Sequence, residues 1–95
     1  MKFIFHPLAE EEYEFSADWY RDLSIIQEKR FLRNVLDTTV LITNNPYLFQ
    51  RIKGEKRAAK VKGFPYSIIY IAEPDYVYIV SVFHNSRNPN IWENR

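Results

Sequence analysis

The feature that most constrains the fold of this chain is a change in the spacing of its apolar residues near residue 56. Before that point apolar side chains recur every three or four residues, which is typical of helices that bury one face. Beyond it they alternate with polar residues or form short β-branched runs, which is typical of strands. Helices followed by strands predict an α+β domain with a helical layer on one face of a sheet.

The N-terminal segment predicts a short strand and then a helix. Residues 2–6 contain three consecutive β-favouring side chains, and Pro7 suits the first position of a helix, where its missing N–H costs nothing. We expect this helix over residues 7–21. One face carries an aromatic-rich stripe, and we expect its apolar members to lie in the core: Leu8, Phe15 and Trp19, with Glu12 on the same face.

A second helix is predicted from Ser24 to about Thr43. Ser24 followed by Gln27 is a possible capping box, and Asn45-Pro46 ends the helix because the residue before proline avoids the helical region. Since the link between the helices is short, they are expected to form an antiparallel hairpin.

The C-terminal half predicts three strands that follow one another. Residues 47–55 are expected to be irregular, residues 56–62 alternate, and residues 64–72 and 76–83 are strongly apolar, the last run typical of a strand buried on both faces. The expected order is an N-terminal strand, the helical hairpin and a three-stranded antiparallel meander, in one domain over residues 1–95.

Composition excludes several classes of function. The chain has no cysteine, which excludes disulfide scaffolds, thiolate zinc sites and thiol nucleophiles. Its two glycines are too few for a glycine-rich phosphate loop. No run is long enough for a membrane span or a signal peptide, so we expect a cytoplasmic protein with no membrane partner, cofactor or metal.

The charges are unevenly distributed although the formal net charge is only +1. Residues 1–23 contain six acidic and two basic side chains, whereas residues 51–62 contain six basic side chains and only Glu55 as an acid. Such a basic segment favours an anionic partner, although it is also compatible with a solvated face. The basic residues are Arg51, Lys53, Lys56, Arg57, Lys60 and Lys62.

Several short motifs, in order along almost the whole chain, resemble those of the RelE/ParE superfamily of toxins, and of its ParE-like branch in particular. The motifs are Phe5-His6-Pro7-Leu8-Ala9-Glu10, Trp19-Tyr20, Asn45-Pro46, Phe64-Pro65-Tyr66-Ser67-Ile68-Ile69-Tyr70, Val82-Phe83-His84, Arg87-Asn88-Pro89 and Trp92.

The resemblance implies a toxin that is encoded with a neutralising antitoxin and that contacts operator DNA only through it. RelE-like members cleave messenger RNA on the ribosome, whereas ParE-like members inhibit DNA gyrase. RelE-like toxins carry an arginine at the position that aligns with Ser67, and serine cannot supply its charge to a scissile phosphate. We therefore favour gyrase inhibition, with a ribosome-dependent messenger-RNA endonuclease and a non-toxic, antitoxin-binding member as alternatives.

If the chain cleaves RNA, His84 and Arg87 are the candidate catalytic residues, because imidazole transfers protons near neutral pH. Arg57, Lys60 and Lys62 would then bind the RNA backbone. A structural role at the end of a strand is the alternative for His84, and a structural role is expected for His6.

Tyrosine is frequent in this chain, and tyrosine is enriched at interfaces. Tyr66, Ile68 and Tyr70 share one face of their strand. With Trp92, they are the candidates for antitoxin binding. A sheet covered by its own chain, or by a second copy, is the alternative.

Overall fold

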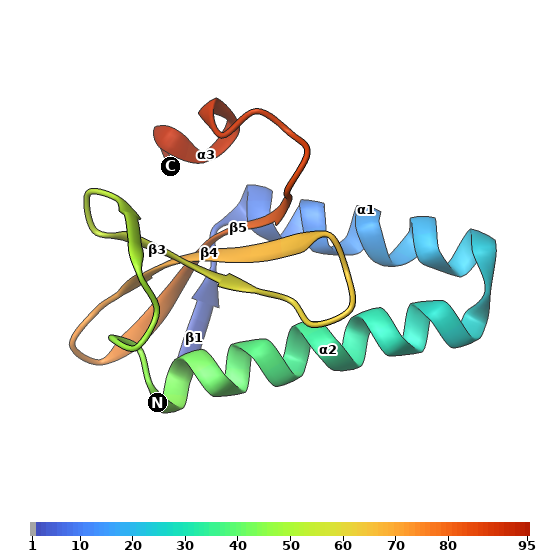
Figure 1. Cartoon of the computed structure of the whole chain (residues 1–95), viewed down its shortest axis with the longest axis horizontal. Helices are drawn as coiled ribbons and strands as arrows, with labels where there is room; N and C mark the ends of the chain where they lie inside the picture. The colour runs from blue at the N-terminus through green and yellow to red at the C-terminus, as the bar shows by residue number, and fades with distance from the viewer. Residues whose placement is uncertain (1) are drawn as a thin grey trace.

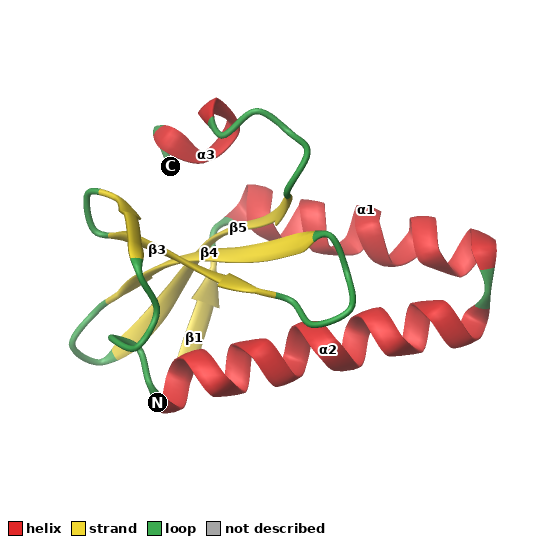
Figure 2. Ribbon diagram, in the orientation of Figure 1, coloured by secondary structure: helices red, strands yellow, loops and turns green. Residues whose placement is uncertain are grey.

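The structure is an α+β sandwich of one mixed sheet and a helical hairpin, seen in a computed structural model that describes residues 2–95. The elements are β1 (Lys2–Phe5), α1 (Pro7–Leu23), α2 (Ile25–Asn44), β2 (Arg51–Lys53), β3 (Lys56–Lys60), β4 (Tyr66–Ala72), β5 (Tyr76–His84) and α3 (Asn90–Glu93). The sheet order is β1-β5-β4-β3-β2. The helices α1 and α2 run side by side along one face of the sheet, and α3 lies at its other side (Figures 1 and 2).

The α+β class and the order of elements agree with the prediction, and β5 lies between two other strands as expected. Two details differ. The segment expected to be irregular contains β2, a three-residue strand paired antiparallel with β3, and the tail contains α3. In addition, β1 pairs in parallel with β5, so the sheet is mixed. A parallel pair needs a long connection, which the hairpin and the intervening strands supply.

The N-termini of α1 and α2 are both capped by side chains. The Leu8 N–H donates to His6 Nδ1 (3.0 Å), which gives His6 the structural role expected for it. The Ser24 hydroxyl accepts from the N–H groups of Ile26 (3.1 Å) and Gln27 (3.5 Å). Only this half of the predicted capping box forms, because the Gln27 side chain accepts from Arg30 instead (2.9 Å).

The prediction that the aromatic stripe of α1 lies in the core is wrong. Phe15 is 66% exposed and Trp19 is 52% exposed. The buried stripe of α1 is the neighbouring one, where small side chains let the helix approach the sheet closely. It contains Ala9, Ser16 and Ala17, with the partly buried Tyr13 and Tyr20.

The main core lies between the hairpin and the sheet and is rich in aromatic rings. The Phe31 ring lies 5.0 Å from Tyr20, 5.1 Å from Tyr66 and 5.4 Å from Phe64, measured between ring centroids. A smaller cluster on the opposite face packs Trp92 against Phe83, at 6.0 Å between centroids.

The strand β5 contains an irregularity that matters for the site. Ile69 pairs with Ser81, and the next residue, Tyr70, pairs with Ile79, so Val80 is an extra residue in β5. Such a bulge increases the local twist of a strand and redirects its side chains. The bulge at Val80 follows directly after Ile79, the last residue of β5 that pairs with β1. The part of β5 beyond the bulge lies beside α1.

Candidate functional site

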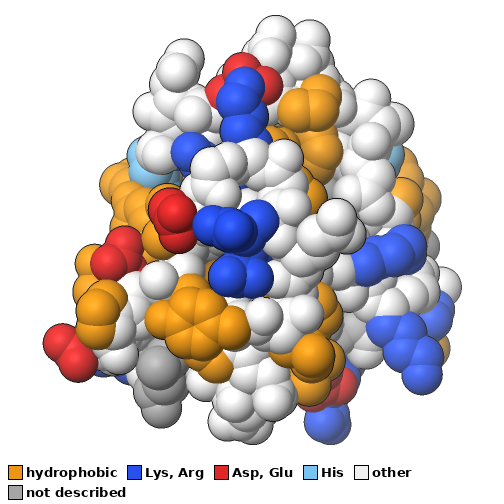
Figure 3. Space-filling model, turned by 60° about the vertical axis from the view of Figure 1, so that its left-hand side comes forward, with side chains coloured by type: hydrophobic (Ala, Val, Ile, Leu, Met, Phe, Trp, Pro, Cys, Tyr) orange, Lys and Arg blue, Asp and Glu red, His pale blue; other side chains and the backbone are white. Residues whose placement is uncertain are grey.

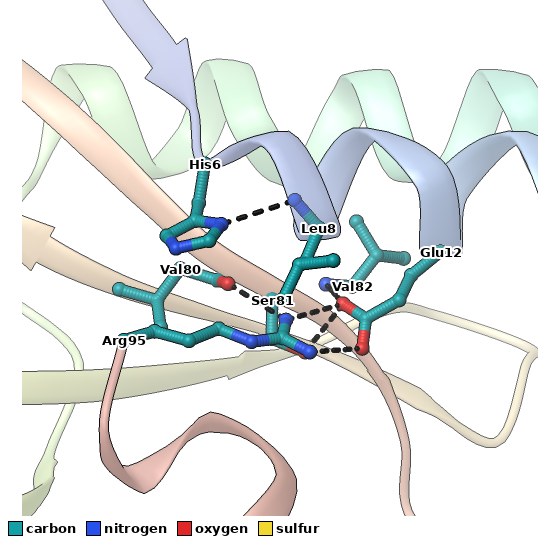
Figure 4. Close-up of polar contacts among 7 residues, drawn as sticks. All are labelled: His6, Leu8, Glu12, Val80, Ser81, Val82 and Arg95. Carbon is teal, nitrogen blue, oxygen red and sulfur yellow. Dashed lines mark hydrogen bonds and ion pairs between the residues drawn. The ribbon is translucent and has the colours of Figure 1, made fainter.

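Within residues 2–95, no strand covers one edge of the second half of β5. β1 pairs with β5 only from Tyr76 to Ile79. Beyond this point, the side chains of Glu12 and Arg95 occupy the place where a neighbouring strand would lie (Figure 4). The Val82 N–H donates to Glu12 Oε1 (3.1 Å), and Arg95 Nη1 donates to the Val80 carbonyl (3.1 Å). Two side chains thus take over hydrogen bonds that a strand would make.

We call this pair the Glu12–Arg95 clamp. Arg95 donates two hydrogen bonds to the carboxylate, from Nη1 to Oε1 (2.9 Å) and from Nη2 to Oε2 (3.1 Å). The Ser81 hydroxyl also donates to Oε1 (2.8 Å). The Arg95 side chain is only 8% exposed and that of Glu12 25% exposed, so the clamp is largely withdrawn from water. A two-pronged ion pair of this kind is among the stronger polar contacts in proteins.

A pocket of about 370 Å³ lies beside the clamp, between α1 and the end of β5. We call it the edge pocket. Its walls combine apolar side chains from α1 and the sheet with charged groups at its rim. The lining residues are Leu8, Glu11, Glu12, Phe15, Ser16, Tyr66, Val82, Phe83, His84, Arg87 and Arg95.

The two candidate catalytic residues, His84 and Arg87, both line the edge pocket. His84 Nδ1 accepts from the Ser86 N–H (3.2 Å) and lies 2.7 Å from the Ser86 hydroxyl oxygen. An acceptor Nδ1 has its lone pair engaged, so in this arrangement the neutral ring carries its proton on Nε2 and acts there as a donor. Arg87 is exposed and makes no ion pair within residues 2–95.

The six basic residues of 51–62 do not form one open patch. Figure 3, which turns the left-hand side of Figure 1 forward, shows basic side chains in separate groups, with acidic and apolar side chains near them. Five of the six bind groups of the chain itself. Arg51 pairs with Glu55 (3.6 Å), Lys53 with Glu93 (3.0 Å), Lys56 donates to the Glu93 carbonyl (3.2 Å), Arg57 to the Phe49 carbonyl (2.6 Å) and Lys60 to the Phe64 carbonyl (3.2 Å).

The four residues predicted to bind the antitoxin are buried by the chain itself. Tyr66, Ile68 and Tyr70 face the helical hairpin in the main core, and Trp92 belongs to the cluster on the opposite face. Tyr70 also donates from its hydroxyl to the Pro46 carbonyl (2.8 Å), and burial raises its pKa. In this structure the alternative of a sheet covered by its own chain therefore holds for these residues. Their role in antitoxin binding remains a prediction.

Exposed apolar side chains lie on both helices of the hairpin. On α2 they are Ile25, Ile26, Leu36, Val40 and Leu41, and α1 carries four. Leu8, Phe15, Trp19 and Leu23 are 46%, 66%, 52% and 62% exposed. We call these four residues the α1 stripe. Its first members, Leu8 and Phe15, also form a wall of the edge pocket. Large apolar side chains gathered on one side of a helix mark an interaction surface when they are not covered.

Glu12 and Arg95 were not among the predicted site residues. Two signals could have pointed to them. Glu12 lies on the same helical face as Leu8, Phe15 and Trp19, and Ser81 interrupts an apolar β-branched run. A polar group within each apolar pattern is the signature of a buried hydrogen bond, but neither signal identifies the partner at the far C-terminal end.

Comparison with known proteins identifies the family of this chain. A family model described as the ParE toxin of type II toxin–antitoxin systems, parDE, matches residues 3–89. The chain belongs to the ParE toxin family. A search of curated proteins gave no match. As a ParE-family toxin it is the toxin component of a type II toxin–antitoxin system, and the family implies an antitoxin partner. Within residues 2–95, no helix of this toxin has the length and apolar character needed to span a membrane.

Proposed function

We propose that this ParE-family toxin acts in the cytoplasm by binding and inhibiting DNA gyrase, and that a cognate antitoxin neutralises it. The observation that carries this proposal is the internal engagement of the groups that RNA cleavage would need. Five of the six basic residues of 51–62 bind carboxylates or carbonyls of the chain itself. Each of these contacts competes with a phosphate for the same cation.

Ser67 and His84 support the same conclusion. Ser67 aligns with the position at which RelE-like toxins carry an arginine. Its hydroxyl donates to Asn85 Oδ1 (2.8 Å). No positive charge is therefore supplied at that position. His84 Nδ1 accepts from the Ser86 N–H (3.2 Å), so in this arrangement that nitrogen is not free to take a proton from a 2′-hydroxyl. A toxin with these features is better suited to act by binding.

The α1 stripe is the surface that we propose for the antitoxin. Its four side chains are between 46% and 66% exposed, and they follow one side of a helix, which suits the apolar face of an amphipathic helix. Beside the stripe, α1 carries exposed acidic residues, so the proposed partner helix has basic flanks. They are Glu11, Glu14, Asp18 and Asp22. We further propose that operator DNA is bound through the antitoxin.

The test is a supercoiling assay with purified toxin and purified gyrase. The expected result is loss of supercoiling activity as the toxin is added, and recovery when the toxin is first mixed with the small protein encoded beside its gene. Boiled toxin is the matched control. Unchanged supercoiling at a large excess of folded toxin would contradict the proposal.

One observation favours a ribosome-dependent messenger-RNA endonuclease as a second candidate, namely that His84 and Arg87 line the same pocket. This function predicts cleavage of ribosome-bound message, and His84→Ala would abolish it. Ribosomes programmed with a single message and incubated with the toxin provide the assay. Intact message with the unmodified toxin would exclude this candidate, and a folded toxin inactive in both assays would indicate a non-toxic member.

A further inference from the structure

We propose that the toxin itself binds the phosphate backbone of duplex DNA through a basic surface on α2, and that this duplex is the one held by gyrase. The inference rests on the proposed function, in that gyrase is the target, and it adds a DNA contact made by the toxin. A backbone contact reads no base sequence, so it leaves recognition of the operator to the antitoxin. The surface, which we call the α2 patch, consists of Lys29, Arg30, Arg33 and Lys62.

The two helices of the hairpin expose opposite charges. α1 exposes five acidic residues and one basic residue, Arg21, which is bonded to Glu28. On α2, every exposed residue from 29 to 34 is basic, and Asp37 is the exposed acid of this helix. Within residues 2–95, the three α2 members of the patch make no ion pair. Their charge is therefore available to an anionic partner.

The turn between β3 and β4 adds a fourth cation. This turn lies against α2 (Figure 1), where Asn34 Nδ2 donates to the Lys62 carbonyl (2.9 Å). Gly63 permits the turn, because its φ of 78° lies in the left-handed region that other residues rarely adopt. Lys62 is exposed, and it is the one member of the basic segment 51–62 whose side chain has no partner within residues 2–95. Residues far apart in the sequence thus carry their charge on neighbouring parts of one surface.

Arg30 is held in place while most of its donors stay free. Its guanidinium carbon lies 5.5 Å from the centroid of the Phe64 ring, and Nη1 donates to Gln27 Oε1 (2.9 Å). A guanidinium group has several N–H donors, and those that remain unused can bind two oxygen atoms of a phosphate together. An arginine that is already oriented by an aromatic ring loses less conformational freedom when it binds.

The composition of the α2 patch favours nucleic acid over an acidic protein. Protein interfaces depend on aromatic and apolar residues at their centre. From residue 29 to residue 34, α2 exposes no apolar side chain. Duplex DNA carries one negative charge per about 1.7 Å of its axis, so closely spaced cations can each reach a phosphate without an apolar anchor.

The test measures binding of a short labelled duplex of arbitrary sequence by fluorescence anisotropy, without gyrase and at several salt concentrations. Lys62→Glu is the main variant, and Arg33→Glu is a second one on α2. Lys2→Glu is the matched control, because it changes the net charge equally and Lys2 is exposed on β1, at the edge of the sheet far from β3. Urea unfolding confirms that each variant is folded.

For the unmodified toxin, the logarithm of the affinity should fall with the logarithm of the salt concentration with a slope of about −3 to −4, the value for three or four phosphate contacts. Lys62→Glu and Arg33→Glu should each weaken binding about tenfold at about 50 mM salt and make the slope shallower by about 1. Lys2→Glu should weaken it less than about threefold. Equal losses for Lys62→Glu and Lys2→Glu, or no binding by the unmodified toxin at low salt, would overturn the inference.

The supercoiling assay separates this inference from the proposed function. If the toxin inhibits gyrase, Lys62→Glu should require about tenfold more toxin for the same inhibition, whereas Lys2→Glu should act like the unmodified toxin. Weaker inhibition by Lys62→Glu without any binding of free DNA would show that the patch contacts an acidic protein surface, which contradicts the inference while the proposed function stands. DNA binding by a toxin that does not inhibit gyrase would overturn the proposed function, and with it the assignment of the duplex to gyrase.

Discussion

Glu12 is the residue on which the open edge of β5 depends most. Its carboxylate accepts from Ser81, from the Val82 N–H and from Arg95, so three donors from the sheet and the C-terminal end meet on one side chain. Removal of such an acceptor leaves donors unpaired in a largely buried place, which costs more than the hydrogen bonds contribute on average. The clamp is therefore a structural requirement of the site that it borders.

We predict that Glu12→Gln lowers the free energy of unfolding by about 2 kcal/mol, because the amide cannot accept both hydrogen bonds from the Arg95 guanidinium. Urea unfolding measures the change. The matched control is Glu14→Gln on the exposed side of α1, for which we expect a change below about 0.5 kcal/mol. Equal effects of the two substitutions would show that the clamp does not stabilise the fold.

The same residue shows the limit of sequence analysis at this scale. His6, Ser24 and Pro7 act on neighbouring backbone groups, so their roles follow from local sequence rules. Glu12 and Arg95 are separated by most of the chain and meet only because the C-terminal segment returns across the sheet. Local patterns carry no information about such a contact.

At the scale of the element, α1 decides which surface is buried and which is offered to a partner. Two stripes on this helix have the same spacing, one with Phe15 and Trp19 and one with Ala9, Tyr13 and Tyr20. Hydrophobic periodicity cannot distinguish the two stripes. Because Phe15 and Trp19 are the larger side chains, the sequence predicted that their stripe is buried, and this was wrong. The sheet takes the stripe that contains Ala9, Ser16 and Ala17 because small side chains permit closer packing, and this leaves Phe15 and Trp19 exposed.

Two identical substitutions test this assignment. We predict that Phe31→Ala lowers the free energy of unfolding by about 3–5 kcal/mol, because Phe31 is fully buried, whereas Phe15→Ala changes it by less than about 0.5 kcal/mol. Urea unfolding gives both values, and antitoxin affinity should fall for Phe15→Ala. A large loss of stability for Phe15→Ala would contradict the observed orientation of α1.

The tyrosines between the helices and the sheet predict a loss of stability at alkaline pH. Burial raises the pKa of Tyr13, Tyr20 and Tyr70. In the unfolded chain these groups lose their protons near pH 10, whereas in the folded chain they keep them. The stability that these three tyrosines contribute should therefore be fully present below about pH 10. It should be lost as the pH rises through their raised pKa values in the folded chain.

Urea unfolding at about pH 9 and about pH 11, on either side of the ordinary tyrosine pKa, measures this loss. Tyr20→Phe should reduce it, because the ionisable hydroxyl is absent, while Tyr47→Phe, at a 65% exposed residue, should leave it unchanged. The same unfolding free energy at both pH values would contradict the assignment.

Most of the elements could be predicted because each has a strong local signal. The helices have the period and the caps of helices, and β4 and β5 are apolar runs separated by Glu73-Pro74-Asp75. The strand β2 was missed because its three residues form no pattern of their own and depend on pairing with β3. The parallel pairing of β1 was missed for the same reason, since no local feature sets the direction of a distant partner.

At the scale of the whole molecule, the basic segment 51–62 has internal partners that a count of charges along the sequence does not show, and its role in binding a partner stays a prediction. The basic residues of 51–62 do lie near one another along β2 and β3, but five of them bind groups of the chain itself. Charge counted along a sequence does not distinguish a cation that holds the fold together from one that awaits a ligand.

We have proposed that this ParE-family toxin acts by binding and inhibiting gyrase. The most direct measurement is to induce the toxin in growing cells without its antitoxin and to follow incorporation of labelled thymidine and labelled methionine in parallel. Inhibition of gyrase predicts that DNA synthesis stops first while protein synthesis continues. An immediate stop of protein synthesis, with DNA synthesis still running, would contradict it.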